Sequence, residues 1–248
     1  MVAGNTFQRF EIKYLVNNRI RCILENEFSG RMIPDEYGVS TICNVYYDTP
    51  DYRLIRKSLD KPVYKEKLRH RSYGQVNGTD KTYIELKKKY KGIVYKRRIS
   101  MPHDEAVRYL GNAIGMSEDS QIARELDYFK NFYIDLKPAV YLCYDRIAYF
   151  SEEDKNLRIT FDDNIRWRRD RMLLTEKPGG NPLLEEGMSL MEIKTAGAMP
   201  LWLVDILSEE RIRKTSFSKY GMAYMTFCSK KLNQDIVNDV CEKYVCNL

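Results

Sequence analysis

The chain has 248 residues, with 41 lysines and arginines against 35 aspartates and glutamates, so its net charge at pH 7 is +6. Hydrophobic residues make up 44% of the chain and the mean hydropathy is −0.53, values typical of a globular protein that can bury a sizeable core. The longest apolar runs, such as Pro200–Val204, are far shorter than the roughly 20 residues that cross a bilayer, and the N-terminus lacks the apolar region of a signal peptide. These features argue against a membrane-spanning or secreted chain.

Periodic apolar patterns predict an α+β protein. In chain order, they predict a strand over Gln8–Val16, a helix over Asn17–Phe28, strands over Thr41–Tyr47, Val63–Tyr73, Lys81–Lys89 and Gly92–Ser100, helices over Asp104–Leu110 and Asp119–Tyr133, strands over Ala139–Phe150, Leu157–Asp162, Ile165–Arg168 and Ser189–Thr195, helices over Leu201–Leu207 and Ser218–Lys230, and a last helix near the C-terminus. No glycine- or serine-rich linker divides the chain, so we expect a single domain over residues 1–248. Groups of strands with helices inserted between them indicate a large antiparallel sheet.

Each predicted strand has a charged face and an apolar face. Side chains alternate along a strand, so Glu85 and Lys87 share one face while Ile84 and Leu86 share the other. The same alternation places these further residues on charged or polar faces: Arg9, Glu11, Lys13, Lys65, Lys67, Arg69, Arg71, Lys89, Lys96, Arg98, Tyr144, Arg146, Arg158, Thr160, Asp162, Glu192 and Lys194. One charged strand face is normally solvated, but its repetition along the chain predicts that the charged faces meet one another.

We therefore expect a closed antiparallel β-barrel of about eight strands, with a basic lumen and with the helices packed outside. An interior rich in lysine and arginine repels itself unless an anion occupies it. The pattern thus predicts a polyanionic ligand.

The cysteines and histidines argue against two other kinds of site. The six cysteines never form a C-x-x-C pair, and only His70 and His103 could assist them, so a zinc site has no support. With two histidines and no G-x-S-x-G motif, a serine or cysteine nucleophile has little support either. We interpret the cysteines as reduced thiols of a cytoplasmic protein.

A Glu-x-Lys triplet occurs three times, as Glu11-Ile12-Lys13, Glu85-Leu86-Lys87 and Glu192-Ile193-Lys194. In each copy the glutamate and the lysine are neighbours on the polar face of a predicted strand. Phosphoryl transfer uses this mixture, because carboxylates are hard ligands for Mg²⁺ or Mn²⁺ and cations neutralise phosphate oxygens.

Several short motifs together resemble a known family. They are Arg9-Phe10-Glu11-Ile12-Lys13-Tyr14, Val45-Tyr46-Tyr47-Asp48, Leu68-Arg69-His70-Arg71-Ser72-Tyr73-Gly74, Tyr83-Ile84-Glu85-Leu86-Lys87, Tyr144-Asp145-Arg146, Met191-Glu192-Ile193-Lys194 and Ser216-Phe217-Ser218-Lys219-Tyr220. In this order they resemble the VTC domain, the catalytic domain of the vacuolar transporter chaperone polyphosphate polymerase, which is one of the triphosphate tunnel metalloenzymes. The resemblance extends from residue 7 to about residue 228.

The resemblance implies a tunnel that binds a nucleoside triphosphate, a growing polyphosphate chain and a divalent metal, Mn²⁺ or Mg²⁺. It assigns catalytic roles to Lys13, Arg69, Arg71, Arg146 and Lys194, and phosphate-binding roles to Lys87, Lys96, Arg98, Tyr144, Arg158, Ser218 and Lys219. It assigns the metal to Glu192, with Glu11 and Glu85 as helpers. We also expect Ser218 to be the N-cap of the last long helix, where Lys219 would add a charge to an anion-binding helix end.

The chain departs from the wider group in two places. The triphosphatase branch begins with E-x-E-x-K, whereas this chain has Arg9-x-Glu11-x-Lys13, which favours the polymerase type. The polymerase pattern also has a basic residue where this chain has Ser216, and Lys214 is a candidate substitute. The regulatory and transmembrane parts of the eukaryotic complex are not recognisable here, so the chain resembles a stand-alone bacterial-type member.

Four functions remain open on this evidence. The first is transfer of the ATP γ-phosphate to a polyphosphate chain. The second is a triphosphatase acting on inorganic triphosphate or nucleotides, and the third is a non-catalytic polyphosphate-binding module or a component that needs a membrane partner. In each of these three cases the expected ligand is ATP, triphosphate, pyrophosphate or polyphosphate. The fourth is nucleic-acid binding through Lys87–Arg98, where basic residues are interspersed with tyrosines. It is disfavoured because a nucleic-acid-binding face would carry lysine and arginine without the paired glutamates that recur along these strands, and we expect no nucleic-acid partner.

Overall fold

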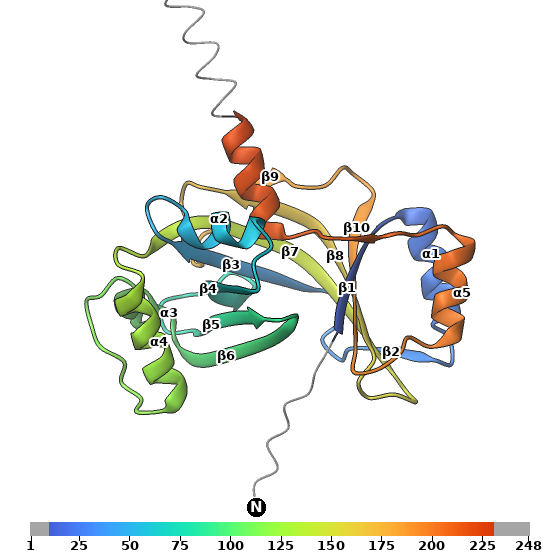
Figure 1. Ribbon diagram of the computed structural model, residues 1–248, viewed down its shortest axis with the longest axis horizontal. Coiled ribbons are helices and arrows are strands. Elements are labelled where there is room, and N and C mark those ends of the chain that lie inside the picture. Colours follow the sequence, from blue (N-terminus) through green and yellow to red (C-terminus); the bar gives the residue numbers. More distant parts are fainter. Residues whose placement is uncertain (1–9, 231–248) are drawn as a thin grey trace, which may run out of the picture.

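The computed structural model describes residues 10–230, and a single antiparallel sheet runs through them (Figure 1). Its strands are β1 (Phe10–Asn17), β2 (Met32–Pro34), β3 (Ser40–Asp48), β4 (Tyr64–Tyr73), β5 (Lys81–Tyr90), β6 (Ile93–Pro102), β7 (Lys137–Ser151), β8 (Arg158–Arg168), β9 (Asn181–Pro182), β10 (Met188–Thr195) and β11 (Lys214–Thr215). The order across the sheet is β11-β1-β10-β8-β7-β3-β4-β5-β6, with β2 on β7 and β9 on β8.

The labelled helices are α1 (Asn18–Glu27), α2 (Arg53–Leu59), α3 (His103–Leu110), α4 (Gln121–Phe132) and α5 (Leu201–Glu209), and residues 219–230 form a further helix. Side-chain caps explain where two of them begin. The Asn17 carboxamide oxygen accepts a hydrogen bond from the N–H of Ile20 at 3.0 Å, and the Ser120 hydroxyl accepts one from Ala123 at 3.2 Å. No helix within residues 10–230 is both long and apolar enough to pass through a membrane.

Two elements differ from their predicted form for local reasons. Helix α2 was not predicted, because its cap lies upstream in β3, where the Asp48 carboxylate accepts the N–H groups of Leu54 and Ile55 at 2.8 and 3.0 Å. The two strands predicted over residues 157–168 are the single strand β8, in which Asn164 has a φ of 49° and interrupts the alternation. The last predicted helix, near the C-terminus, lies outside the described residues.

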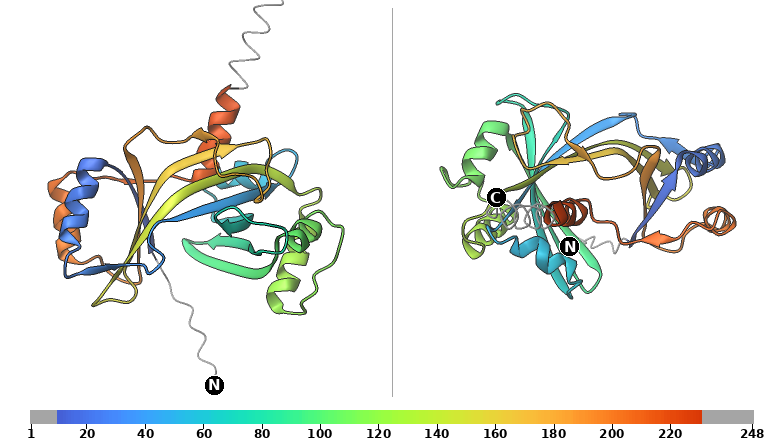
Figure 2. Two further views of the ribbon diagram at one scale, coloured as in Figure 1. Left: turned by 180° about the vertical axis from the view of Figure 1, so that it is seen from behind. Right: turned by 90° about the horizontal axis from the view of Figure 1, so that it is seen from above.

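Three apolar clusters place the helices around the sheet. One packs α3 and α4 against β3–β6, and a second packs α1 and α5 against β1, β8 and β10, so these helix pairs lie at opposite ends of the molecule (Figure 1). The third cluster packs α2 and the helix over 219–230 against the side of β3 and β7 that faces away from α3 and α4, through residues such as Tyr46, Leu142 and Tyr220. Seen from above, the last helix stands within the curve of the sheet (Figure 2).

The α+β class is confirmed, but the predicted closed barrel is wrong. The end strands of the sheet, β6 and β11, share no backbone hydrogen bonds in the described part of the chain. The outer edge of β1 is occupied by β11, which pairs Thr215 with Lys13 and Lys214 with Tyr14, so β1 cannot also pair with β5 or β6 there. Side chains bridge the gap instead, since Lys87 on β5 reaches Glu11 on β1 at 3.3 Å.

Candidate functional site

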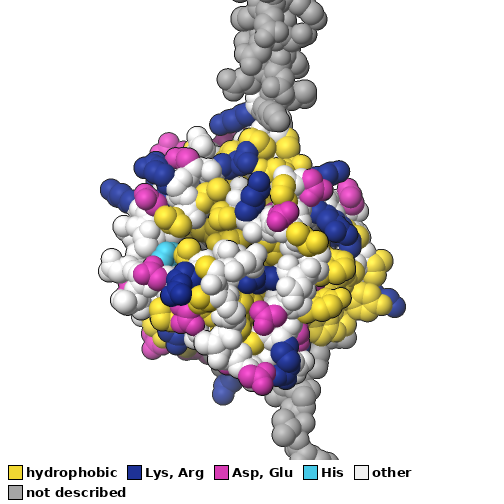
Figure 3. All heavy atoms as spheres, turned by 90° about the vertical axis from the view of Figure 1, so that its left-hand side faces the viewer, with side chains coloured by type: hydrophobic (Ala, Val, Ile, Leu, Met, Phe, Trp, Pro, Cys, Tyr) yellow, Lys and Arg dark blue, Asp and Glu magenta, His cyan; other side chains and the backbone are white. Residues whose placement is uncertain are grey.

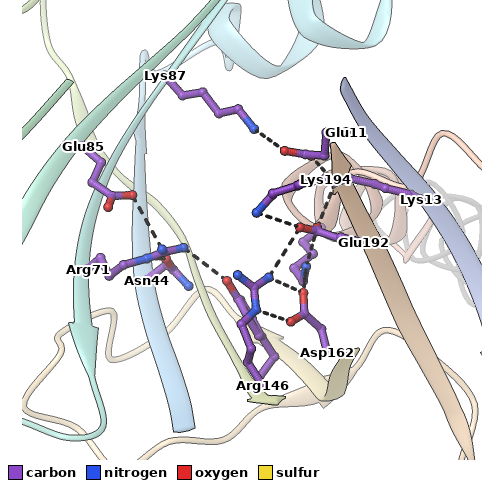
Figure 4. Close-up of polar contacts among 12 residues, drawn as sticks. Glu11, Lys13, Asn44, Arg71, Glu85, Lys87, Arg146, Asp162, Glu192 and Lys194 are labelled. Atoms are coloured by element: carbon purple, nitrogen blue, oxygen red, sulfur yellow. Dashed lines mark hydrogen bonds and ion pairs between the residues drawn. The ribbon is translucent and has the colours of Figure 1, made fainter. Parts of the chain in front are cut away.

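The charged side chains of both halves of the sheet point toward one another across its curve. Figure 4 shows residues of β3, β4 and β5 on one side facing residues of β1, β8 and β10 on the other. We call this side of the sheet the inner face. The register follows the alternation expected from the sequence, because Glu11 lies opposite Lys194 and Lys13 lies opposite Glu192.

The first group of charges on the inner face surrounds Glu192 and Asp162. We call it the Glu192 centre, and it consists of Glu192, Asp162, Lys13, Arg146, Lys194 and Lys219. One oxygen of Glu192 lies 3.1 Å from Lys13 Nζ and 3.3 Å from Lys219 Nζ, and the other lies 3.5 Å from Arg146 and 3.8 Å from Lys194. Arg146 also holds Asp162 through two hydrogen bonds, of 2.5 and 2.7 Å, and Lys219 pairs with the same carboxylate. Two buried carboxylates therefore share four cations.

These contacts keep the two carboxylates ionised. Burial alone would raise the pKa of Glu192, but Lys219, Lys13 and Arg146 lower it well below its usual range. Burial likewise opposes ionisation of Asp162, and Lys219 and Arg146 lower its pKa. In turn, Glu192 and Glu11 raise the pKa of Lys13 despite its burial. Glu192, Asp162 and Lys13 are thus charged at neutral pH, whereas burial lowers the pKa of Lys194 to about 8.

The second group surrounds Glu85, which is only 1% exposed. We call it the Glu85 centre, and it consists of Glu85, Arg69, Arg71, Lys96 and Arg98. Arg69 Nε and Lys96 Nζ each lie 2.8 Å from the carboxylate, Arg98 Nε lies at 2.6 Å and Arg71 lies at 3.8 Å. Although burial opposes ionisation, these cations lower the pKa of Glu85. One carboxylate here neutralises only part of the charge of four cations.

Neutral side chains fix the two arginines of β4. Arg71 donates to the Asn44 carboxamide oxygen at 2.8 Å and to the Tyr144 hydroxyl at 3.2 Å. Arg69 donates to the Tyr46 hydroxyl at 3.0 Å. The guanidinium groups are therefore oriented by the sheet before any further partner binds, which suits a bidentate grip on an oxyanion.

The final helix contributes its N-terminus to the inner face. Ser218 caps it as predicted, because its hydroxyl accepts the N–H of Gly221 at 3.1 Å. Lys219, at the first helical turn, is 9% exposed and reaches the Glu192 centre. Its ammonium group also lies 4.5 Å from the centroid of the Tyr144 ring.

The structure brings together most of the residues singled out in the sequence. Lys87 is on the same strand as Glu85 and connects the two centres through Glu11. It pairs with Glu11, whose carboxylate also lies 3.3 Å from Lys13 Nζ in the Glu192 centre. Arg158 shares the inner parity of β8, but its ion pair goes to Asp35 at 3.6 Å and its guanidinium covers the Phe150 ring. In the register of β8 and β10, Arg158 lies opposite Lys194 at the edge of the Glu192 centre, while Arg9 lies outside the described residues.

Sequence reasoning missed the importance of three inner-face residues. Asp162 is completely buried and is the second acid of the Glu192 centre, and Asn44 positions Arg71. Lys67 donates to Ser218 at 2.9 Å. The alternation of β4 and β8 placed Lys67 and Asp162 on charged faces, but no motif marked them out from their neighbours.

The carboxylates suit a divalent cation unequally. Glu11 and Glu192 are ionised, lie on paired strands and share Lys13, with the pKa of Glu11 lowered to about 2 by Lys87 and Lys13 against the effect of burial. Residues 10–230 contain no cluster of three or more acidic, histidine or cysteine side chains that could hold a metal alone. Mg²⁺, however, is commonly held by one or two carboxylates together with phosphate oxygens and water. The pair Glu192 and Glu11, two carboxylates that share Lys13, fits such a cation. Glu85 fits it less well, because its four cations pair with no second carboxylate in the described part of the chain.

The face that carries α3 and α4 shows no comparable gathering of one charge among its described residues (Figure 3). On the face that carries α3 and α4, acidic and basic side chains alternate with apolar ones (Figure 3). Arg97 and Lys88, on the outward side of β6 and β5, both pair with Glu125 of α4. The excess of positive charge is therefore a property of the inner face rather than of this outer surface.

Comparison with known proteins agrees with this arrangement. A solved structure of a proposed adenylate cyclase from Bacillus halodurans is 17% identical, covers 85% of this chain and 95% of its own, and superposes with a TM-score of 0.51, so it shares the fold. Another, of a proposed adenylate cyclase from Vibrio parahaemolyticus, is 10% identical and covers 87% of this chain and 97% of its own, with a TM-score of 0.46. The family model of the VTC domain matches residues 8–228, and because that match takes in nearly all of the 248 residues, the chain belongs to the VTC domain family.

Proposed function

We propose that the protein is a metal-dependent polyphosphate polymerase that transfers the γ-phosphate of ATP to the end of a polyphosphate chain on the inner face. Membership of the VTC domain family supports a reaction on triphosphates. The observation that carries the proposal is the excess of cations over carboxylates at both centres, which an anion with many oxygens would balance.

The proposed roles follow from position. Lys13, Lys194, Arg146 and Lys219 would exchange their contacts with Glu192 and Asp162 for phosphate oxygens at the reacting end. Arg69, Arg71, Lys96 and Arg98 would hold neighbouring phosphates, with Lys87, Tyr144 and Ser218 between the two groups. In-line phosphoryl transfer requires mainly positioning and neutralisation of charge, so this set needs no general base.

Glu192, helped by Glu11, would hold Mn²⁺ or Mg²⁺ together with the phosphates. When bound, that cation would neutralise charge on the transferred phosphoryl group. Glu85 would serve instead as the permanent counter-ion of Arg69 and Arg98. Arg158, near Asp35, would contact only a chain long enough to extend beyond the Glu192 centre.

Arg9 is a basic residue at the position where the triphosphatase branch has a carboxylate. It therefore favours the polymerase reaction over hydrolysis of a triphosphate. We propose ATP and polyphosphate as the substrates, with triphosphate or pyrophosphate as short substitutes. The four cysteines in the described part of the chain are free thiols, in keeping with a cytoplasmic location.

The test is an incubation of the purified chain with ATP and Mn²⁺, with polyphosphate resolved on a gel. Lys194→Met, which keeps the stem but removes the charge, should abolish chain growth. The matched control is Lys88→Met, because Lys88 is on the same sheet but faces outward to Glu125. Orthophosphate release without chains would overturn the proposal in favour of a triphosphatase, and binding without turnover would overturn it in favour of a binding module.

A further inference from the structure

Three lysines lie directly opposite one another across β4, β5 and β6 on the inner face. Lys67 is paired in register with Lys87, and Lys87 with Lys96. We call these residues the lysine row. Like charges directly opposite in neighbouring strands destabilise a sheet, so the row requires compensation from elsewhere.

Within the described residues, only two lysines of the row have a carboxylate partner. Lys87 pairs with Glu11 at 3.3 Å, and Lys96 pairs with Glu85 at 2.8 Å. In the described part of the chain Lys67 has no carboxylate partner, and its ammonium group donates to the Ser218 hydroxyl at 2.9 Å. The charge at one end of the row is therefore left without a counter-ion.

The charged groups that act most strongly on Lys67 are all positive. Lys65 and Arg69 flank it on β4, Lys87 faces it from β5 and Lys13 faces it from β1. From the final helix it meets the hydroxyl of Ser218, whose backbone begins that helix. A half-buried lysine in such a position is a place where an anion would relieve repulsion from several directions at once.

Building on the proposed function, we propose that Lys67 and Ser218 form an additional phosphate subsite, which joins the Glu85 centre to the N-terminus of the final helix. The phosphate would supply the negative charge that the lysine row lacks. Of the three lysines in the row, Lys67 would gain most from it, because Glu11 and Glu85 already serve the other two.

The subsite should couple binding to proton uptake. Burial, together with Lys13 and Lys87, lowers the pKa of Lys67 to about 7, so about nine in ten Lys67 side chains are neutral at pH 8. A phosphate in hydrogen-bond contact stabilises the ammonium form and raises this pKa again. Each ligand that occupies the subsite at pH 8 should therefore take up close to one proton at Lys67.

The experiment is a calorimetric titration with inorganic tripolyphosphate in the presence of EDTA, so that neither metal nor turnover is involved. Lys67→Met should weaken binding about tenfold or more, the effect of losing one charge-assisted hydrogen bond. Lys88→Met should bind as the wild type does. If Lys67→Met also matches the wild type, the subsite does not exist.

Proton uptake gives a second readout that a merely structural role would not change. Titrations at pH 8 in buffers of different ionisation enthalpy measure the protons taken up per ligand. Lys67→Arg, which remains charged, should retain binding but take up nearly one proton fewer than the wild type. Lys96 and Lys194, whose pKa values burial lowers to about 8, account for uptake that persists in this variant. Equal uptake in the variant and the wild type would overturn the proposal.

These results are separable from the proposed polymerase activity. Loss of tripolyphosphate binding in Lys67→Met supports the subsite even if the wild type makes no polyphosphate from ATP. Conversely, chain growth in the wild type together with unchanged binding in Lys67→Met would refute the subsite alone. Absence of any tripolyphosphate binding by the wild type would overturn both proposals.

Discussion

Strand β4 points Arg69 and Arg71 toward the inner face and His70, which lies between them, toward the opposite, outer face. Both faces are buried, but the ionisable groups described below are charged on the inner face and neutral on the outer face. On the inner face, partners of opposite charge overcome burial, so that Glu85 and Glu192 remain ionised. On the outer face, burial lowers the pKa of His70 to about 3, with a smaller contribution from His103, so the ring is neutral.

The contrast arises from what each face contacts. His70 stacks on His103 with ring centroids 5.3 Å apart and shares a hydrogen bond with the Thr82 hydroxyl at 2.7 Å, within the apolar layer under α3 and α4. The two rings need no counter-ion, because burial lowers the pKa of both and favours their neutral form. The inner face instead contains charges whose mutual compensation is incomplete. The sheet is therefore a partition between a neutral core and a preorganised electrostatic site.

Breaking a pair at the Glu192 centre should have the largest effect on stability. Arg146→Met removes both hydrogen bonds to Asp162 and one contact to Glu192, leaving buried carboxylates with fewer cations. We expect the free energy of unfolding to fall by about 3–5 kcal/mol in urea titrations. The matched control, Arg124→Met, breaks an exposed pair with Asp119 and should cost less than about 1 kcal/mol. Similar losses in the two variants would show that the surplus positive charge cancels the benefit of the buried pair.

The outer face should dominate the response to mild acid. The pKa of His70 is lower in the folded chain, about 3, than its ordinary value of 6.5, so its contribution to stability is complete above pH 6.5 and is lost as the pH falls toward 3. Between pH 6.5 and 4.5 we expect a loss of about 2–3 kcal/mol from this group. The carboxylate Glu11, with a folded pKa of about 2, loses its contribution only below about pH 4.5.

His70→Phe tests this assignment because it keeps a ring against His103 but cannot be protonated. Urea midpoints measured from pH 7.5 to 4.5 should fall less steeply in the variant than in the wild type. Equal slopes would mean that the inner face, rather than the histidine pair, governs acid sensitivity in this range.

A single arginine of the Glu85 centre should have a smaller but clear effect on binding. Arg71→Met should weaken tripolyphosphate binding by about 1.5–3 kcal/mol, the scale of a charge-assisted hydrogen bond. Arg97→Met is its matched control, because Arg97 faces outward and contacts Glu125 at 3.3 Å. Calorimetry would measure both, and an unchanged affinity in Arg71→Met would remove this arginine from the site.

The alternation of side chains made much of the site predictable from the sequence. It identified the inner-face residues strand by strand, because a half-buried strand repeats every two residues. The α+β class followed from the same patterns. Lys13, Arg69, Arg71, Arg146 and Lys194 were expected as one group, with Lys219 added from a helix end. The structure divides the group, with Arg69 and Arg71 at Glu85 and with Lys13, Arg146 and Lys194 at Glu192, where Lys219 joins them.

The remainder depended on contacts between distant parts of the chain. Whether the sheet closes depends on which strand takes the outer edge of β1, and the short strand β11 carries too little periodicity to be predicted. The start of α2 depends on Asp48, which caps it from the end of another strand. Lys67 differs from the other two lysines of the row because it has no carboxylate partner in the described part of the chain. Which lysines have such a partner depends on the register of β4, β5 and β6, which the sequence pattern does not predict.

The smallest difference that we expect between the Glu192 and Glu85 centres is in the metal dependence of turnover. Glu192→Gln keeps the shape of the side chain but removes the charge that a hard cation requires, so we expect half-maximal turnover to need about tenfold more Mn²⁺. Glu85→Gln should leave the metal requirement unchanged, since the cations around Glu85 pair with no second carboxylate in the described part of the chain that could share a metal with it. Titration of turnover with Mn²⁺ at saturating ATP compares the two variants directly. An unchanged metal response in Glu192→Gln would leave Glu192 with only the task of holding the cations around it. In that case the Glu192 and Glu85 centres would differ in their number of carboxylates but not in their chemistry.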